Sequence, residues 1–121
     1  MPKKCKVLVV EDKERYQYGW ADALGEKIEV LHAFTIEEGR RLFDANPDID
    51  AVVMDACVPG NEPNSIPLVK YIRKSFKGPV IAASTEKIFR ERLIEAGCNF
   101  ESEKDRVPAI VNEVLALRFQ I

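Results

Sequence analysis

The sequence is poor in the residues that build zinc sites and disulfide frameworks. Among 121 residues there are one histidine, His32, and three cysteines, Cys5, Cys57 and Cys98, which show no CxxC spacing. An odd number of widely spaced cysteines favours reduced thiols, as in a cytosol, and a zinc site needs a closer set of ligands. His32 and the single tryptophan, Trp20, are most simply interpreted as packing residues.

A large excess of one charge and long apolar runs are also missing. The net charge is −2 at pH 7, from 18 basic and 20 acidic residues. Nucleic-acid binding through a basic surface is therefore not expected. No apolar segment approaches the roughly 20 residues of a membrane helix, and no signal-peptide hydrophobic region follows the basic start. We expect a cytoplasmic protein that binds neither nucleic acid nor membrane.

What the sequence does contain is a regular alternation of apolar runs and amphipathic segments, without repeats or linkers. Strands are expected at 6–10, 28–33, 51–54, 80–83 and, most weakly, 98–104; helices are expected at 13–24, 35–45, 65–76, 86–96 and 107–119. Alternating strands and helices predict βαβ units with right-handed crossovers. Residues 1–121 are therefore expected to form one α/β domain with a doubly wound, five-stranded parallel sheet.

Two helix starts carry capping signals. Thr35-Ile-Glu-Glu38 is a capping box, with Thr35 as the N-cap residue. Ser65 is a plausible N-cap for the third helix, where Pro67 falls in the permissive first turn.

Polar side chains follow four of the five expected strands: Glu11 and Asp12, then Asp55, then Ser84 and Thr85, then Lys104. Because the carboxyl ends of parallel strands line one crevice, these residues are expected to lie together. Three crowded carboxylates repel one another, and a hard divalent cation relieves the repulsion. Mg2+ fits, because it uses few protein carboxylates together with phosphate oxygens.

The remaining groups suit a phosphoryl group. A lysine supplies a point charge and a hydroxyl supplies a hydrogen bond, as Lys104 and Ser84 would. Asp55 would then be the nucleophile that accepts the phosphoryl group as an aspartyl phosphate.

Each of these residues also has an ordinary structural interpretation. Glu11 and Asp12 could stabilise the start of the first helix, where the macrodipole favours acids. Asp55 could begin a turn, and Ser84 could be a turn hydroxyl. Lys104 could be a solvated lysine in the charged run 101–106. The sequence leaves these alternatives open.

The motifs at 9–12, 53–60 and 80–84, together with Lys104, resemble the receiver domain of bacterial two-component response regulators, of the single-domain, chemotaxis-regulator type. The resemblance covers essentially the whole chain. It implies a flavodoxin-like (βα)5 fold with strand order 2-1-3-4-5. It also implies Glu11, Asp12, Asp55 and the main-chain carbonyl of Cys57 as Mg2+ ligands.

The same resemblance implies a function. A sensor histidine kinase or histidine phosphotransfer protein would donate a phosphoryl group to Asp55, with Ser84 as switch hydroxyl and Lys104 as phosphate-pairing cation. The domain would not be a conventional enzyme. It would signal to a downstream protein through its fourth helix, fifth strand and fifth helix, and residues 1–121 would include no output domain.

Several positions depart from the family pattern. Thr85 follows the switch hydroxyl where a smaller residue is usual, and Glu101 replaces the usual aromatic residue, although Phe100 is adjacent. Asp105 replaces the proline after the lysine, so the usual cis peptide bond is not assured there, and the loop after Gly60 is long. These departures leave a second hypothesis, a receiver-like interaction module that does not depend on phosphorylation.

A third hypothesis is an enzyme of the haloacid-dehalogenase type, which also uses an aspartate nucleophile. That family needs a second aspartate two residues after the first, and Cys57 occupies the place here. The chain is also too short for a substrate cap, so this hypothesis is the least favoured.

Overall fold

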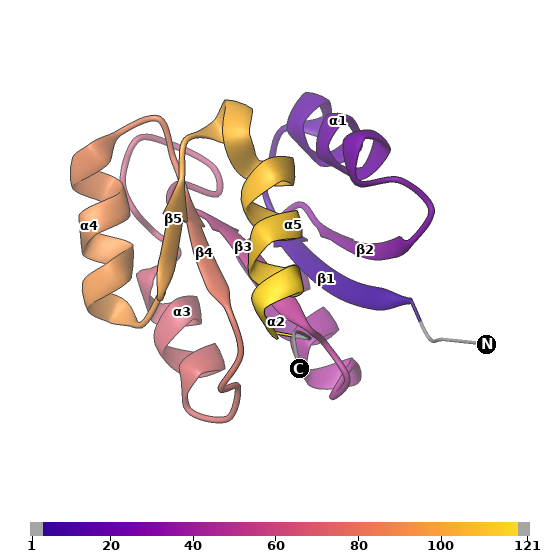
Figure 1. The fold of residues 1–121 in the computed structure, drawn as a ribbon. Helices are drawn as coiled ribbons and strands as arrows, with labels where there is room; N and C mark the ends of the chain where they lie inside the picture. Colours follow the sequence, from indigo (N-terminus) through magenta and orange to yellow (C-terminus); the bar gives the residue numbers. More distant parts are fainter. Residues whose placement is uncertain (1–3, 119–121) are drawn as a thin grey trace.

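The computed structural model describes residues 4–118 and shows a five-stranded parallel sheet between two layers of helices (Figure 1). The strand order is β2-β1-β3-β4-β5, so the predicted 2-1-3-4-5 topology is confirmed. The strands are β1 (Cys5–Val10), β2 (Ile28–Ala33), β3 (Ala51–Asp55), β4 (Val80–Ala83) and β5 (Phe100–Ser102). The helices are α1 (Glu14–Leu24), α2 (Ile36–Ala45), α3 (Ile66–Arg73), α4 (Lys87–Ala96), the 3-10 turn η1 (Lys104–Arg106) and α5 (Val107–Arg118).

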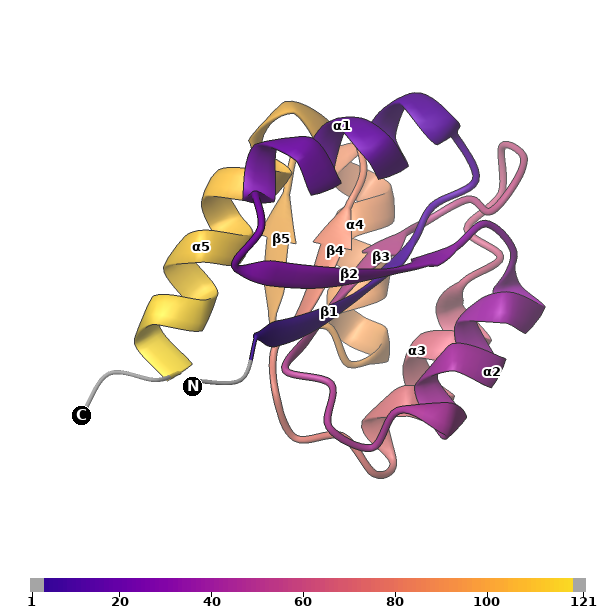
Figure 2. The same ribbon diagram turned by 90° about the vertical axis from the view of Figure 1, so that its right-hand side faces the viewer.

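The central strands are apolar because both of their faces are covered. In β1, Leu8 and Val10 pack with residues of α2, α3 and α4, whereas Val7 and Val9 pack with α1 and α5. Figure 2 shows this arrangement from the β2 edge, with α1 and α5 on one side of the sheet and α2 and α3 on the other. Every residue of β3 is buried. Burial on both faces explains the continuous apolar runs in the sequence.

Two elements are shorter than predicted. Helix α3 ends at Arg73, and the residues after it form a turn in which the Arg73 guanidinium donates hydrogen bonds to the carbonyls of Phe76 and Gly78. Strand β5 covers only Phe100–Ser102, because the backbone enters η1 at Lys104. The predicted helical residue Phe119 lies outside the described residues.

The two capping predictions have different outcomes. Thr35 Oγ1 accepts a hydrogen bond from the Glu38 amide at 3.0 Å, so this cap is confirmed. The Glu38 carboxylate bonds to the Phe34 amide at 2.7 Å. Ser65 lies at the N-cap position of α3, but its hydroxyl donates to the Ala56 carbonyl at 3.0 Å and caps nothing. Its side chain therefore fastens α3 to the end of β3.

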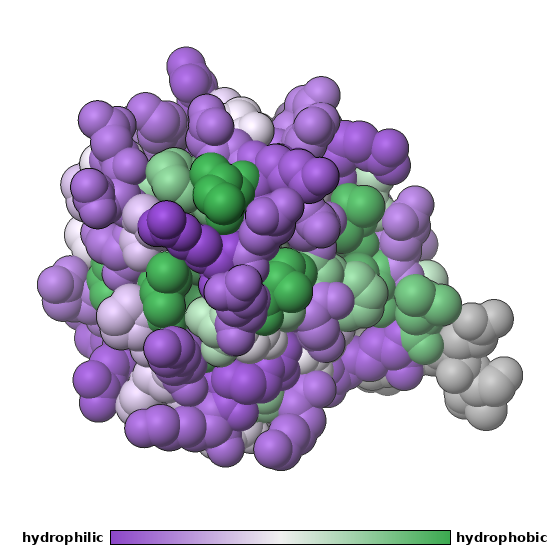
Figure 3. Space-filling view, turned by 90° about the vertical axis from the view of Figure 1, so that its left-hand side faces the viewer, coloured by the Kyte–Doolittle hydropathy of each residue, from purple (hydrophilic) through white to green (hydrophobic). Residues whose placement is uncertain are grey.

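The face of the molecule formed by α4 is mainly hydrophilic (Figure 3). Figure 3 views the side of the molecule formed by α4 and shows hydrophobic side chains as separate groups among hydrophilic ones. Within residues 4–118 the large apolar side chains that are exposed are Tyr18, Ile88, Ile94 and Leu117. None of the helices in this part of the chain is both long enough and apolar enough to cross a bilayer.

Candidate functional site

The register of the sheet brings the predicted residues to one edge. Val10 pairs with Met54, so Glu11 follows β1 beside Asp55 at the end of β3. Asp55 in turn pairs with Ala83, which places Ser84 one residue beyond it. Lys104 follows β5 and begins η1. The clustering predicted from the strand ends is therefore confirmed.

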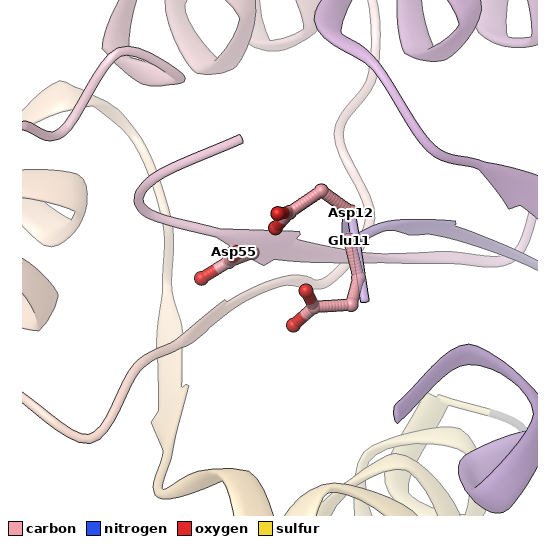
Figure 4. Close-up of side chains that lie close together, drawn as sticks. All are labelled: Glu11, Asp12 and Asp55. Carbon is pink, nitrogen blue, oxygen red and sulfur yellow. The ribbon is translucent and has the colours of Figure 1, made fainter. Parts of the chain in front are cut away.

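The three acidic side chains converge, as Figure 4 shows. One carboxylate oxygen each from Glu11, Asp12 and Asp55 lies within 4.8 Å of the others. Glu11 is fully buried, Asp55 is 4% exposed, and Asp12 is half-buried. Oxygen donors at this spacing suit a hard divalent cation such as Mg2+.

The three carboxylates are not equally available. Both Glu11 oxygens already have protein partners, since Oε1 lies 2.6 Å from Lys104 Nζ and Oε2 accepts from the Lys13 amide at 3.0 Å. Asp55 uses one oxygen, Oδ1, which lies 3.1 Å from the same ammonium. Within the described part of the chain, the Asp12 carboxylate makes no hydrogen bond or ion pair. Asp12 and the second Asp55 oxygen are thus the donors that a metal ion would reach first.

Lys104 is a member of the cluster and is not a solvated surface lysine. Its side chain is 11% exposed and its ammonium bridges Glu11 and Asp55. Burial alone would lower the pKa of Lys104, but the hydrogen bond to Glu11 and the negative charges of Asp55 and Glu11 outweigh burial and raise it. Lys104 is therefore a permanent cation at neutral pH.

The cluster still carries an excess of negative charge, because three carboxylates face one ammonium. Burial, and after it the charge of Glu11, raises the pKa of Asp55 to about 7, against the opposing effect of Lys104. A cation bound beside Asp55 would favour its ionised form. With all three carboxylates ionised, the site would carry a net charge of about −2. One divalent cation would neutralise it.

Ser84 lines the same cavity, of about 420 Å3, as Asp12, Asp55 and Lys104. Its hydroxyl accepts a hydrogen bond from the Glu86 amide at 3.1 Å, so it is a turn hydroxyl in this conformation. Its carbonyl accepts from Arg90 Nη1 at 2.8 Å. The neighbouring Thr85 is exposed and also lines the cavity.

Cys57 borders the cavity as well, but its thiol is not activated. Burial, and then the negative charge of Asp55, raises the pKa of Cys57 above its usual value. A protonated thiol is a poor nucleophile. The predicted contribution of Cys57, through its main-chain carbonyl, does not involve the thiol.

Three residues of α1 have roles that the sequence analysis missed. Trp20 Nε1 donates to the Lys104 carbonyl at 2.9 Å. The Tyr16 ring centroid lies 4.6 Å from Lys104 Nζ. Gln17 is buried, and its amide nitrogen donates to three carbonyls, including that of Glu11 at 3.1 Å. The Gln17 oxygen accepts from His32 Nδ1 at 2.6 Å, so neither His32 nor Trp20 is only a packing residue.

The structure shows the local contacts at the positions that depart from the family pattern. Glu101 Oε1 accepts from Arg90 Nε at 2.8 Å, so an ion pair connects α4 and β5. Between residues 4 and 118 the one cis peptide bond is Val58–Pro59, and the bond after Lys104 is trans. The long loop after Gly60 is anchored by Asn64, whose side-chain amide exchanges two hydrogen bonds with the Val58 backbone.

Comparisons with known proteins establish the fold. Searches with the sequence found no matching family model and no matching curated protein. Among solved structures, the receiver domain of the Francisella response regulator 1452 is 23% identical, with a TM-score of 0.77 over 95% of this chain and 99% of that one. A two-component response regulator from Clostridium difficile is 18% identical, with a TM-score of 0.82 over 97% and 100% of the two chains.

A third similar structure is a CheY-like response regulator receiver domain protein from Methanospirillum hungatei. It is 18% identical, with a TM-score of 0.79 over 96% of this chain and 97% of that one. All three alignments cover nearly the full length of both chains. Residues 4–118 therefore have the fold of a response regulator receiver domain, with the acidic cluster at the carboxyl ends of the strands.

Proposed function

We propose that this chain is a phosphoacceptor that takes a phosphoryl group on Asp55 in a two-component phosphorelay. The observation that carries the proposal is the position of the Lys104 ammonium, which lies within 3.1 Å of both Glu11 and Asp55 in a buried acidic cluster. A nucleophilic carboxylate beside a fixed cation and a cavity is the arrangement that phosphoryl transfer requires.

In the proposed reaction, an Asp55 carboxylate oxygen attacks the phosphorus of the donor. The new oxygen–phosphorus bond forms as the bond to the donor breaks, and the donor leaves with that electron pair. Lys104 offers its ammonium to a phosphoryl oxygen, and Ser84 offers its hydroxyl after leaving the Glu86 amide. Both contacts stabilise charge that develops on the transferred group.

Asp12, Asp55 and the Cys57 carbonyl would hold Mg2+. Glu11, which the family resemblance implies as a further ligand, has both oxygens engaged by Lys104 and the Lys13 amide and would instead orient Lys104. Bound there, Mg2+ would supply positive charge toward the phosphoryl oxygens. The donor would be a sensor histidine kinase or a histidine phosphotransfer protein. Once phosphorylated, the domain would act on a downstream protein and would catalyse no turnover of a separate substrate.

A conformational change at the site would be transmitted to the rest of the domain through Ser84. Arg90 of α4 holds the Ser84 carbonyl and, through its Nε atom, Glu101 of β5. Movement of Ser84 toward a phosphoryl group would therefore act on α4 and β5 together. A phosphoryl group that contacts one arrangement better than the other shifts the population between them.

Intact mass tests this proposal. The protein is incubated with acetyl phosphate and MgCl2, in parallel with Asp55→Asn and with the control Asp22→Asn, an exposed aspartate of α1. We expect a phosphoryl mass increment in the native chain and in Asp22→Asn, and none in Asp55→Asn. An equal increment in Asp55→Asn would contradict the assignment of Asp55.

The bonds of Arg90 to the Ser84 carbonyl and to Glu101 favour a second candidate function. In this candidate the chain is an interaction module that does not depend on phosphorylation. These bonds fix the loop after β4 in one position, with the Ser84 hydroxyl already in use. Magnesium binding without any phosphoryl increment would favour this candidate.

A further inference from the structure

The Lys104 residue is held at two points by aromatic side chains of α1. Its ammonium lies 4.6 Å from the centroid of the Tyr16 ring, and its carbonyl accepts the Trp20 indole N–H at 2.9 Å. One contact fixes the end of the side chain and the other fixes the backbone from which it extends. Both residues lie on α1, far from Lys104 in the sequence.

The two rings form one unit. Tyr16 and Trp20 are one helical turn apart, and their rings stack with a centroid separation of 5.2 Å and an interplanar angle of 27°. Trp20 is 5% exposed and packs in the core between α1, α5 and the sheet. Tyr16 is half-buried, and it also has the exposed Arg15 guanidinium 5.0 Å from its ring. The core thus fixes Trp20, and Trp20 orients Tyr16 beside the ammonium.

We propose that Tyr16 and Trp20 are positioning residues that hold the Lys104 ammonium between Glu11 and Asp55. A lysine side chain has four rotatable bonds, so two salt bridges alone leave it other arrangements around the acids. An aromatic face adds a directional attraction for the cation and covers it from water. Preorganised charge of this kind stabilises a transition state without reorganisation at the moment of reaction.

The effect on catalysis rests on the proposed phosphoacceptor function, but the positioning itself does not. A direct test of position is the NMR signal of the Lys104 side-chain CεH2 group in protein labelled with 13C-lysine, assigned with Lys104→Arg. Because the Lys104 ammonium lies 4.6 Å from the Tyr16 ring centroid, the ring current of Tyr16 should displace this signal. We expect Tyr16→Leu to move it toward the values of exposed lysines, and Tyr16→Phe to preserve it.

The functional test is the initial rate of phosphorylation by acetyl phosphate at saturating MgCl2. Tyr16→Leu is expected to lower this rate by about three- to tenfold, the factor that corresponds to loss of one shielded cation–π contact. Tyr16→Phe should keep the native rate because it retains the aromatic ring. Trp20→Phe removes the N–H donor but retains an aromatic core residue, and is expected to lower the rate by about twofold to fivefold.

Tyr18→Leu is the matched control, because Tyr18 lies on the same helix, is 54% exposed and contacts His32 and Phe34 rather than Lys104. It should leave both the Lys104 signal and the rate unchanged. Thermal unfolding and Mg2+ affinity are measured for each variant. These controls distinguish a displaced Lys104 from a loss of folding or a loss of metal binding.

An unchanged Lys104 signal in Tyr16→Leu would overturn the proposal, whatever the rate does. A displaced signal with an unchanged rate would overturn the catalytic part. If the native chain accepts no phosphoryl group while the signal still depends on Tyr16, the proposed phosphoacceptor function fails and the positioning of Lys104 stands.

Discussion

Lys104 and Glu11, 93 residues apart in the sequence, form the shortest salt bridge described in this structure, with 2.6 Å between Nζ and Oε1. Glu11 is fully buried and the Lys104 side chain is 11% exposed, and the same ammonium contacts Asp55. The bridge joins the end of β5 to the end of β1 across the edge of the sheet. It therefore fixes the Lys104 ammonium against the acidic cluster.

Loss of the Lys104 charge should weaken the fold and strengthen metal binding. In Lys104→Met, Glu11 and Asp55 remain buried without their cation, so we expect the free energy of unfolding to fall by about 2–4 kcal/mol in metal-free buffer at pH 8. The more negative site should bind Mg2+ more tightly. Urea unfolding with and without MgCl2 measures both effects.

Lys70→Met, at an exposed position of α3, is the control for loss of a positive charge. Equal stability of the Lys104 and Lys70 variants would show that the bridge contributes nothing.

Stability should depend on pH through Asp55. The pKa of Asp55 is raised to about 7 in the folded protein by burial and by the charge of Glu11, whereas the ordinary pKa of an aspartate, 3.8, applies in the unfolded chain. Between these values the folded state binds more protons, so the free energy of unfolding decreases as pH rises from about 4 to 7. Other acids contribute their own slopes, so the informative quantity is the difference between the native chain and Asp55→Asn.

That difference should grow in favour of Asp55→Asn across the same pH range in EDTA, reaching about 3–4 kcal/mol above pH 7. Saturating MgCl2 should reduce or reverse it, because bound cation favours the ionised aspartate. Urea titrations at several pH values measure it. A constant difference from pH 4 to 8 would show that Asp55 titrates normally.

Asp12 should be the most sensitive position for metal affinity. Its carboxylate is half-buried and lacks protein partners among the described residues, so Asp12→Asn would remove a proposed metal ligand without leaving another charge unpaired. We expect the dissociation constant for Mg2+ to rise by about tenfold. Isothermal titration calorimetry measures this constant, and Asp22→Asn on α1 is the charge-matched control. Equal affinities for the two variants would remove Asp12 from the metal site.

Close packing of α2 is tested by Gly39→Ala. A Cβ atom at Gly39 would lie 2.9 Å from Leu68 Cδ2 and 3.0 Å from Val10 Cγ2. Overpacking should therefore cost about 1–3 kcal/mol of stability, although alanine is the better helix former. Gly19→Ala in α1 meets no atom within 4 Å and should instead stabilise the protein by about 0.5–1 kcal/mol. Urea unfolding of both variants decides whether α2 packs this closely.

The topology and the acidic cluster were predictable because they follow from local patterns. Apolar runs such as β3 identify buried parallel strands, and the acids directly after them must meet at one edge of the sheet. Helix and strand ends were less predictable where side-chain hydrogen bonds to the backbone hold the turn that follows. After α3, this turn is held by the hydrogen bonds of Arg73 to residues 76–78, which no helix-propensity pattern contains.

The charged residues of the cluster could be named from the sequence, but their contacts could not. Lys104 lies in a polar run that is equally typical of a solvated surface, and only the tertiary structure distinguishes the two cases. The α1 residues Tyr16 and Trp20 have ordinary amphipathic spacing, which conceals their contacts with Lys104. A tryptophan one turn after a tyrosine, on the helix that follows the acidic pair, was the available signal.

The proposed attachment of a phosphoryl group to Asp55 is tested most directly by locating the acyl phosphate. After treatment with acetyl phosphate and MgCl2, borohydride reduces an aspartyl phosphate to homoserine, and peptide mass mapping then identifies the reduced residue. We expect homoserine at position 55 and aspartate at position 12, with no reduction when MgCl2 is replaced by EDTA. Reduction at another acid, or at none while Mg2+ is bound, would show that Asp55 is not the phosphoacceptor.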